Sequence, residues 1–414
     1  MQRPNNPIGN DEQRAHELLA LDYFNHPEIV RAREEVRVFW LEHAEPSAAM
    51  RRAFEWAFEE VMFGATVWAL NQDPLYPKVI TISRLAHTVD GRHIPGSRWG
   101  IDNPDSVYRV IPISGAERYV IRGRVSEPRL VENYFTLWDS AMKTLGLLDG
   151  KQLKVDAEGL FTVTVDASAA DGRANHIQAP PDSHEFYIRD VIARWGEDRV
   201  NELSIERLGP PPLRPPFSEA ENLARIKTYL QRWATETTRW NRQAMDKPAN
   251  GFEFTIDRDS DGALRNQIYI MGYFRLPDKS TAMVLDINLG GADYFIAPIT
   301  NIWGTTNCIT ERTGCLNRHQ ALANPDGSLT FVLSVTDPGV HNWLDPSDLD
   351  EGILTLRWAE FASGEPETGL SVKQRLVPLT EVLAQVPDNQ RMTTEMRAEQ
   401  LRERAASYAW RLEE

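Results

Sequence analysis

The chain has 414 residues, of which 42% are hydrophobic and 25% charged, so it is long enough for two to three domains of about 150 residues and too apolar for a disordered protein. Acidic residues outnumber basic ones 60 to 45, which gives a formal net charge of -15. A surface with this balance repels phosphate backbones and anionic lipids, so we expect neither a nucleic acid nor a membrane as partner.

The N-terminal part, residues 1–78, predicts a helical element. Leu18, Leu19 and Tyr23 recur at helical spacing, and Ser47 after the break at Pro46 fits the N-cap of a further helix. The N-terminus lacks a basic stretch followed by an apolar run, and the longest apolar stretch is too short for a bilayer span. We therefore expect a cytoplasmic protein.

Two β-rich regions follow, at residues 79–209 and 251–362. Segments such as VYRVIPI, RYVIRGRV, NQIYIMGYF and SLTFVLSV alternate in polarity or form short apolar runs between turn residues, as antiparallel strands do. The pattern predicts an α+β fold that is mainly β, with an antiparallel β-sandwich or jelly-roll-like core in two halves.

Helical segments separate and close these halves. Residues 210–250 hold a proline-rich connector, PPPLRPP, and a helix that Ser218 and Glu221 begin as a capping box. Residues 363–414 form a tail with a second helix, whose alternating charges suit a solvated face or an oligomer contact. The possibility that the protein forms a homo-oligomer therefore stays open.

Several chemistries have no local motif. The chain contains no G-x-S-x-G elbow, no phosphate-binding glycine loop and no H-E-x-x-H, and its two cysteines, Cys308 and Cys315, have six residues between them and read as free thiols. The segment DRDSDG, residues 257–262, resembles the start of a calcium loop, but the twelfth position is Ile268 instead of glutamate. An acidic hairpin turn is the favoured interpretation, and we expect no metal and no cofactor.

The remaining candidates for chemistry lie in two loops and the strands beside them. Histidine and tyrosine can transfer protons, arginine can stabilise an oxyanion, and tryptophan can line an apolar pocket. The same turns, Asn-Pro-Asp and Asp-Pro-Gly, also occur as ordinary loop structure, so a purely structural role stays open. The catalytic candidates are Asp105, Tyr108, His341 and Arg357, and the substrate-binding candidates are Arg109, Arg122, Trp303, Asn342, Trp343 and Trp358.

Patterned blocks of the sequence resemble a bacterial family catalogued as domain of unknown function twelve-fourteen. The blocks include RWGIDNPDSVYRV, NQIYIMGYFRLP, DPGVHNWLD and GILTLRW, and they cover about residues 98–209 and 266–360. The resemblance implies a β-sandwich or jelly-roll-like core. This chain departs from the family pattern at His341, where proline usually precedes Asn-Trp, and at residues 346–348.

Elimination leads to a hypothesis about function. Without a motif for a metal, a nucleophile or a phosphate, we expect a cofactor-independent catabolic enzyme, and first a lyase, that uses acid/base chemistry on a hydrophobic or aromatic small molecule. This hypothesis requires that the loop before Tyr108 and the loop around His341 meet in one pocket. The alternatives are a noncatalytic β-sandwich binding or assembly module and a metal-dependent enzyme whose ligands come from distant strands.

Overall fold

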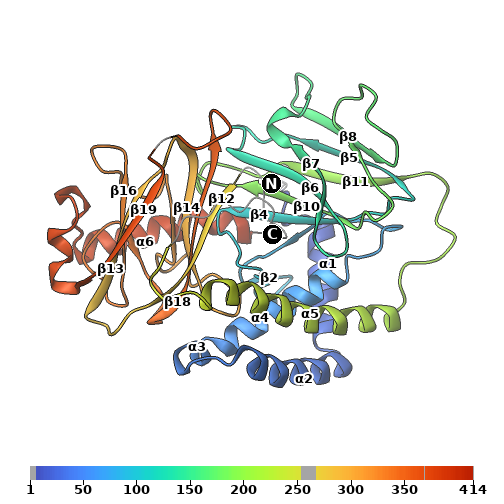
Figure 1. The fold of residues 1–414 in the computed structure, drawn as a ribbon. Helices are drawn as coiled ribbons and strands as arrows, with labels where there is room; N and C mark the ends of the chain where they lie inside the picture. Colours follow the sequence, from blue (N-terminus) through green and yellow to red (C-terminus); the bar gives the residue numbers. More distant parts are fainter. Residues whose placement is uncertain (1–5, 253–266, 368, 414) are drawn as a thin grey trace.

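The computed structural model describes residues 6–252, 267–367 and 369–413. Two β-sandwiches lie beside each other, and a layer of helices covers one side (Figure 1). The predicted α+β fold with mainly antiparallel β-sandwich structure is confirmed. The acidic turn at residues 257–262, which we compared with a calcium loop, lies outside the described residues.

The first sandwich packs a five-stranded sheet on a four-stranded one. Alternate residues point inward, so that Phe135, Phe161 and Phe186 meet in its core. Most strands pair antiparallel, and only β8 and β9 pair parallel. In sheet order, the strands are β1 (Ile80–Ile82), β4 (Ser106–Pro112), β10 (Glu185–Val191), β6 (Glu132–Trp138) and β7 (Thr144–Asp149), and then β11 (Glu202–Leu208), β5 (Arg118–Arg124), β8 (Leu160–Asp166) and β9 (His176–Gln178).

In the described part of the chain, the second sandwich consists of two four-stranded sheets around its own core, which includes Phe295, Phe331 and Trp358. The parallel pair here is β16 with β17. In sheet order, the strands are β12 (Gln267–Arg275), β18 (Glu351–Phe361), β14 (Ala292–Thr300) and β15 (Cys315–Asn317), and then β17 (Trp343–Leu344), β16 (Leu329–Leu333), β13 (Thr281–Asn288) and β19 (Ser371–Pro378).

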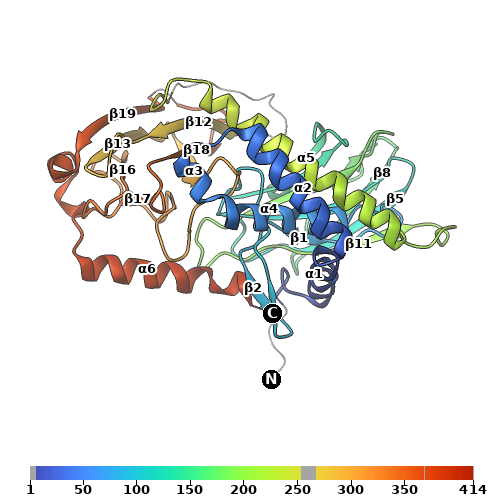
Figure 2. The same cartoon turned by 90° about the horizontal axis from the view of Figure 1, so that it is seen from below.

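The helices occupy two places. Figure 2 shows α2 and α5 side by side and α6 at a separate edge beside the second sandwich. The predicted caps are confirmed: Ser218 and Glu221 form a capping box at the start of α5, and Ser47 caps α3. The helices are α1 (Asp11–Phe24), α2 (Pro27–Ala44), α3 (Ala48–Arg52), α4 (Phe54–Ala69), α5 (Glu219–Met245) and α6 (Thr394–Tyr408), and a small hairpin joins β2 (His87–Val89) to β3 (Arg92–Ile94).

Apolar side chains join these layers. Trp68 of α4 and Trp233 of α5 pack against each other, with ring centroids 5.0 Å apart, in a cluster that also contains Tyr108 of β4. Val191 of the first sandwich and Ile296 of the second belong to another shared cluster. The helices and both sandwiches therefore share buried surfaces. No helix among the described residues is long and apolar enough to cross a membrane.

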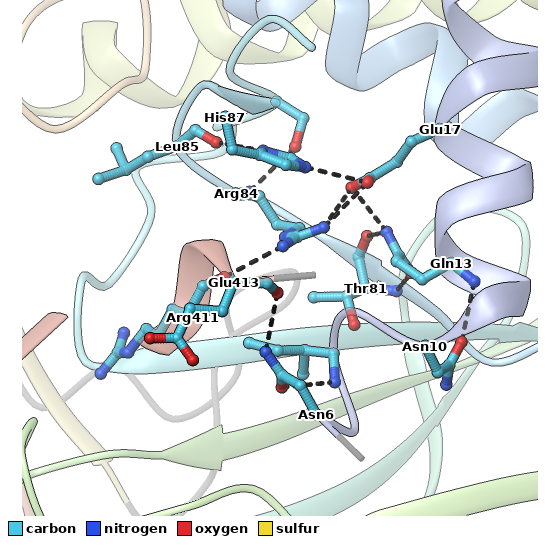
Figure 3. A network of polar contacts seen from close by, with 12 residues as sticks. Asn6, Asn10, Gln13, Glu17, Thr81, Arg84, Leu85, His87, Arg411 and Glu413 are labelled. Carbon is cyan, nitrogen blue, oxygen red and sulfur yellow. Dashed lines mark hydrogen bonds and ion pairs between the residues drawn. The ribbon is translucent and has the colours of Figure 1, made fainter. Parts of the chain in front are cut away.

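A buried ionic network ties α1 to the segment before β2 (Figure 3). The Glu17 carboxylate accepts two hydrogen bonds from Arg84, at 2.7 and 2.9 Å, and lies 3.0 Å from Nε2 of His87. Gln13 also donates to Glu17, and Arg84 donates to the carbonyl of Arg411 near the C-terminus. Burial alone raises the pKa of Glu17, but the charge of Arg84 and these hydrogen bonds lower it to about 2.

Candidate functional site

The five-stranded sheet of the first sandwich and the β12–β18–β14 side of the second present polar and aromatic residues on their outer faces. Tyr108, Arg189 and Tyr134 stand in one row across β4, β10 and β6. Tyr269 and Arg357 stand opposite each other on β12 and β18. We call the following residues the inter-sheet cluster: Tyr108, Glu132, Trp138, Tyr187, Arg189, Gln267, Tyr269 and Arg357.

Glu132 is the acid of the inter-sheet cluster. Its side chain is fully buried, Oε1 accepts a hydrogen bond from the Gln267 amide, and Oε2 has no hydrogen-bond partner in the described part of the chain. Burial raises the pKa of Glu132 to about 7, although the bond from Gln267 and the nearby charges of Arg189 and Arg357 act against this rise. A carboxyl group with this pKa can both donate and accept a proton near neutral pH.

Arg357 supplies positive charge from the second sandwich. It is 8% exposed, it donates to the carbonyl of Ile101, and its guanidinium lies 5.4 Å from the ring centroid of Tyr269. Its Nε atom lacks a hydrogen-bond partner, and no carboxylate among residues 6–252, 267–367 and 369–413 forms an ion pair with it. Because Arg357 has no ion-pair partner within the described ranges, its buried guanidinium favours an anionic group beside it.

Aromatic rings form one wall of the cluster. Tyr187 stacks on Trp138 with ring centroids 4.2 Å apart and on Tyr108 at 5.2 Å. The guanidinium of Arg189 lies 4.6 Å from the centroid of the Tyr187 ring. Tyr187 and Tyr269 are only partly buried, so solvent reaches this wall. The rings and the cations together suit a planar molecule with negative charge.

Further buried polar atoms on the same faces lack hydrogen-bond partners among the described residues. They are Oγ1 of Thr136 and Nε1 of Trp138 on β6, and Oγ1 of Thr355 on β18. Thr136 stands opposite Tyr187, and Thr355 lies two residues before Arg357 on the same face. An unpaired buried polar atom costs about 1–3 kcal/mol, so several of them on facing sheets indicate groups that a ligand can satisfy.

Asp105 and Tyr108, two predicted catalytic residues, come close to each other but differ in surroundings. Asp105 is fully buried and accepts hydrogen bonds from Trp195 at 2.7 Å, Asn317 at 2.9 Å and Tyr294 at 3.1 Å. Burial raises the pKa of Asp105 to about 6, and these bonds oppose the rise. Its bonds to Asn317 and Tyr294 join the two sandwiches. Tyr108 instead belongs to the inter-sheet cluster.

The other two predicted arginines lie elsewhere. Arg109 follows Tyr108 on β4 and points to the opposite face, where it is buried against Asp190 in an ion pair. Arg122 lies on the exposed face of β5 and pairs with Glu206 at 2.6 Å beside a recess of about 720 Å³. Neither arginine is a member of the inter-sheet cluster.

The predicted loop at His341 lies apart from Tyr108, next to α6. The backbone N–H of His341 donates to Gln390, and burial lowers the pKa of its imidazole. Asn342 is fully buried and uses its side chain to bind the N–H and carbonyl of Leu322 and the carbonyl of Thr330. Trp343 donates to the carbonyl of Ser334 at 2.9 Å. The two loops that we expected to share a pocket thus have separate neighbours.

The remaining predicted tryptophans are core residues. Trp303 packs on Trp40 and Phe54 of the helical layer and donates to the carbonyl of Met50. Trp358 points into the core of the second sandwich, 5.1 Å from Phe295 between ring centroids. Of the predicted site residues, the structure brings Tyr108 and Arg357 together in the cluster, with Asp105 nearby at the same interface.

Glu132 and most of the aromatic residues of the inter-sheet cluster were not among the predicted site residues. Glu132 and Gln267 are the first residues of their strands, and a contact between residues this far apart leaves no local motif. Tyr187 and Arg189 did carry a signal, because they alternate with Phe186 and Ile188, which face the core. Such alternation is typical of a strand with one face in water, so the sequence alone does not show that this second face is covered.

The inter-sheet cluster contains neither of the two cysteines. Cys308 and Cys315 are free, and Cys315 is buried. Within the described ranges, no group of three or more His, Cys, Asp or Glu side chains could hold a metal ion. The metal-dependent alternative therefore has no candidate ligand set in this part of the chain.

Comparisons with known proteins support the fold. No family model matches the sequence, and no curated protein matches it either. The structure is similar to the crystal structure of an uncharacterized protein from Burkholderia cenocepacia, with a TM-score of 0.71 and 22% identity over 89% of this chain and 99% of that chain. A weaker likeness, with a TM-score of 0.44 and 10% identity over 78% and 99% of the chains, is to the VPA0106 protein of Vibrio parahaemolyticus.

Proposed function

We propose that the protein binds a planar organic anion, such as an aromatic carboxylate or a phenolate, at the inter-sheet cluster and that Glu132 transfers a proton to or from it. The observation that carries this proposal is the set of buried, unpartnered polar atoms on the facing sheets. Oε2 of Glu132 and Nε of Arg357 belong to this set. A molecule that pairs with them removes the cost of leaving them buried alone.

Different residues of the inter-sheet cluster contact different parts of the ligand. Arg357 holds the negative group of the ligand, because it has no carboxylate partner of its own in the described ranges. Tyr187 and Tyr269, which are only partly buried, contact the ring of the ligand. Most of a small ligand would be removed from water here, which strengthens its interaction with the arginine.

Glu132 supplies the chemistry in this proposal. At neutral pH, with its pKa raised to about 7, it exists in both protonation states. Gln267 holds Oε1 and leaves Oε2 to face the substrate, so Gln267 is a positioning residue. Proton transfer beside an arginine-bound oxyanion begins many eliminations, isomerisations and hydrolyses, and within these the lyase step that the sequence suggests stays a prediction.

A turnover screen with phenols and aromatic carboxylates tests the proposal. We compare the wild-type protein with Glu132→Gln and with the control Glu206→Gln, which changes an exposed glutamate on β11. Loss of a general acid or base lowers turnover by about 100-fold or more, while the control keeps the wild-type rate. Wild-type turnover in Glu132→Gln would refute the role of Glu132, and binding without turnover by any variant would favour a noncatalytic binding module.

A further inference from the structure

A second cavity, of about 430 Å³, lies where the helical layer meets the second sandwich. Ala53, between α3 and α4, and Trp56 of α4 line it on one side, and Ile309 and Leu349 line it from loops of the second sandwich. None of its lining residues belongs to the inter-sheet cluster. Its volume falls in the range of pockets that bind small molecules, about 300–1,000 Å³.

The cavity wall contains one buried hydrogen-bond acceptor that is not used. Asn307 is fully buried, and its Nδ2 atom donates to the carbonyl of Pro346 at 2.9 Å. Its Oδ1 atom has no hydrogen-bond partner within the described part of the chain, although Asn307 lines the cavity. An amide oxygen accepts but does not donate, so a ligand here must bring an O–H or N–H group.

The charged residues around this cavity are already neutralised. Arg98 binds Glu60 through two nitrogens, at 2.7 and 2.9 Å, and also donates to Thr306. Asp348 pairs with Arg312 at 2.9 Å. A charged ligand would therefore lose its hydration without finding a free counter-ion at these groups, whereas a neutral ligand would not.

We propose that this cavity binds a small, uncharged, mainly apolar molecule whose hydroxyl group donates a hydrogen bond to Oδ1 of Asn307. Simple phenols and aliphatic alcohols have this chemistry. The apolar body lies against Trp56, Ile309 and Leu349, and the hydroxyl satisfies Asn307. The site is separate from the proposed proton-transfer site and does not depend on it.

The chain carries a built-in reporter of occupancy. Cys308 is partly exposed and lines the cavity. The other cysteine, Cys315, is buried, and burial raises the pKa of its thiol to about 12, so it stays protonated and shielded. A bulky disulfide reagent therefore reacts with Cys308 in the folded protein, and a molecule in the cavity hinders this reaction.

The test measures the rate at which the full chain reacts with 5,5′-dithiobis(2-nitrobenzoate), with and without 4-ethylphenol or its methyl ether. The proposal predicts that saturating 4-ethylphenol slows the reaction at least about fivefold and that the ether, which cannot donate to Asn307, protects much less. Equal rates with and without the phenol, or equal protection by phenol and ether, would overturn the proposal. Neither outcome depends on a variant.

Two variants place the binding site. Leu85 lines the cavity and is partly exposed, so Leu85→Trp fills the cavity with little disturbance of the core and should abolish protection. Arg357→Gln changes the inter-sheet cluster and should leave protection unchanged. Protection that survives Leu85→Trp, or that disappears in Arg357→Gln, would place the phenol elsewhere and refute the site. A melting temperature equal to that of the wild type shows that each variant is folded.

Discussion

The side-chain amide of Gln267, in the second sandwich, donates a hydrogen bond to the carboxylate of Glu132, in the first. The hydroxyl of Tyr269 in turn donates to the side-chain oxygen of Gln267. The acid of the inter-sheet cluster is thus held by the sandwich opposite to its own. We infer that the position of Glu132 and its shifted pKa depend on how the two sandwiches pack.

The first prediction concerns stability and pH. The pKa of Glu132 in the folded protein, about 7, lies above the ordinary pKa of a glutamate, 4.5, so folding favours the protonated form. Its contribution is fully present below about pH 4.5 and is lost as the pH rises through 7, by about 3 kcal/mol at most. Urea unfolding at pH 5 and pH 8 should show a larger loss in the wild type than in Glu132→Gln, in which Asp105, whose pKa is also raised, still titrates. Identical pH dependence in both proteins would contradict the raised pKa.

Asp105 provides a second prediction. In Asp105→Asn one carboxylate oxygen becomes an amide nitrogen, which cannot accept the bonds from Trp195 or from Asn317 and Tyr294. We expect a loss of about 2–3 kcal/mol in the free energy of unfolding. The control Asp293→Asn, at an exposed residue on β14, should change stability by less than about 1 kcal/mol. Equal losses in the two variants would show that Asp105 does not join the sandwiches.

Substitutions of the neighbouring residues Asn342 and His341 should lower stability by different amounts. Asn342→Ala removes three side-chain hydrogen bonds in a fully buried position and should cost about 2–4 kcal/mol of stability. His341→Ala removes an imidazole whose side-chain contact is to Asn342 and should cost less than about 1 kcal/mol. Thermal unfolding of both variants measures the difference. A larger loss in His341→Ala would assign the histidine the structural role.

Glu17 gives a prediction at acid pH. Its pKa in the folded protein, about 2, lies below the ordinary pKa of a glutamate, 4.5, so its contribution to stability is present above pH 4.5 and disappears as the pH falls through 2. Glu17→Gln should lose about 3 kcal/mol at pH 7 and less at pH 3. The control Glu28→Gln, in a surface pair with Lys227, should leave the free energy of unfolding nearly unchanged. A loss that is the same at both pH values would exclude the ionic mechanism.

Much of the fold follows from local patterns. Alternation in β12 places Ile268 and Ile270 in the core and Tyr269 on the other face, and Ser218 with Glu221 starts α5 as predicted. These features depend on neighbours in the chain, so the sequence alone can reveal them.

The site follows less directly from the sequence. Tyr108 and Arg357 were predicted because rings and arginines beside turns are common in pockets. Glu132 owes its raised pKa to burial, and its hydrogen-bond partner Gln267 lies 135 positions away in the sequence. The His341 loop carried the most specific motif, and yet Asn342 uses its amide to hold its own loop. The side-chain amide of an asparagine can form hydrogen bonds to the backbone of its own loop or to a ligand. Only the positions of the neighbouring groups show which of these roles it has.

Calorimetric titration of aromatic carboxylates and phenols into the wild-type protein, Arg357→Gln and Arg122→Gln tests the central claim most directly. Arg357 lies in the inter-sheet cluster, whereas Arg122 is an exposed arginine paired with Glu206, and the two variants make the same change of charge. We predict that at least one compound binds the wild type, that Arg357→Gln weakens its binding tenfold or more, and that Arg122→Gln leaves it unchanged. Absence of binding by every compound, or equal affinities for the wild type and Arg357→Gln, would contradict the proposed site.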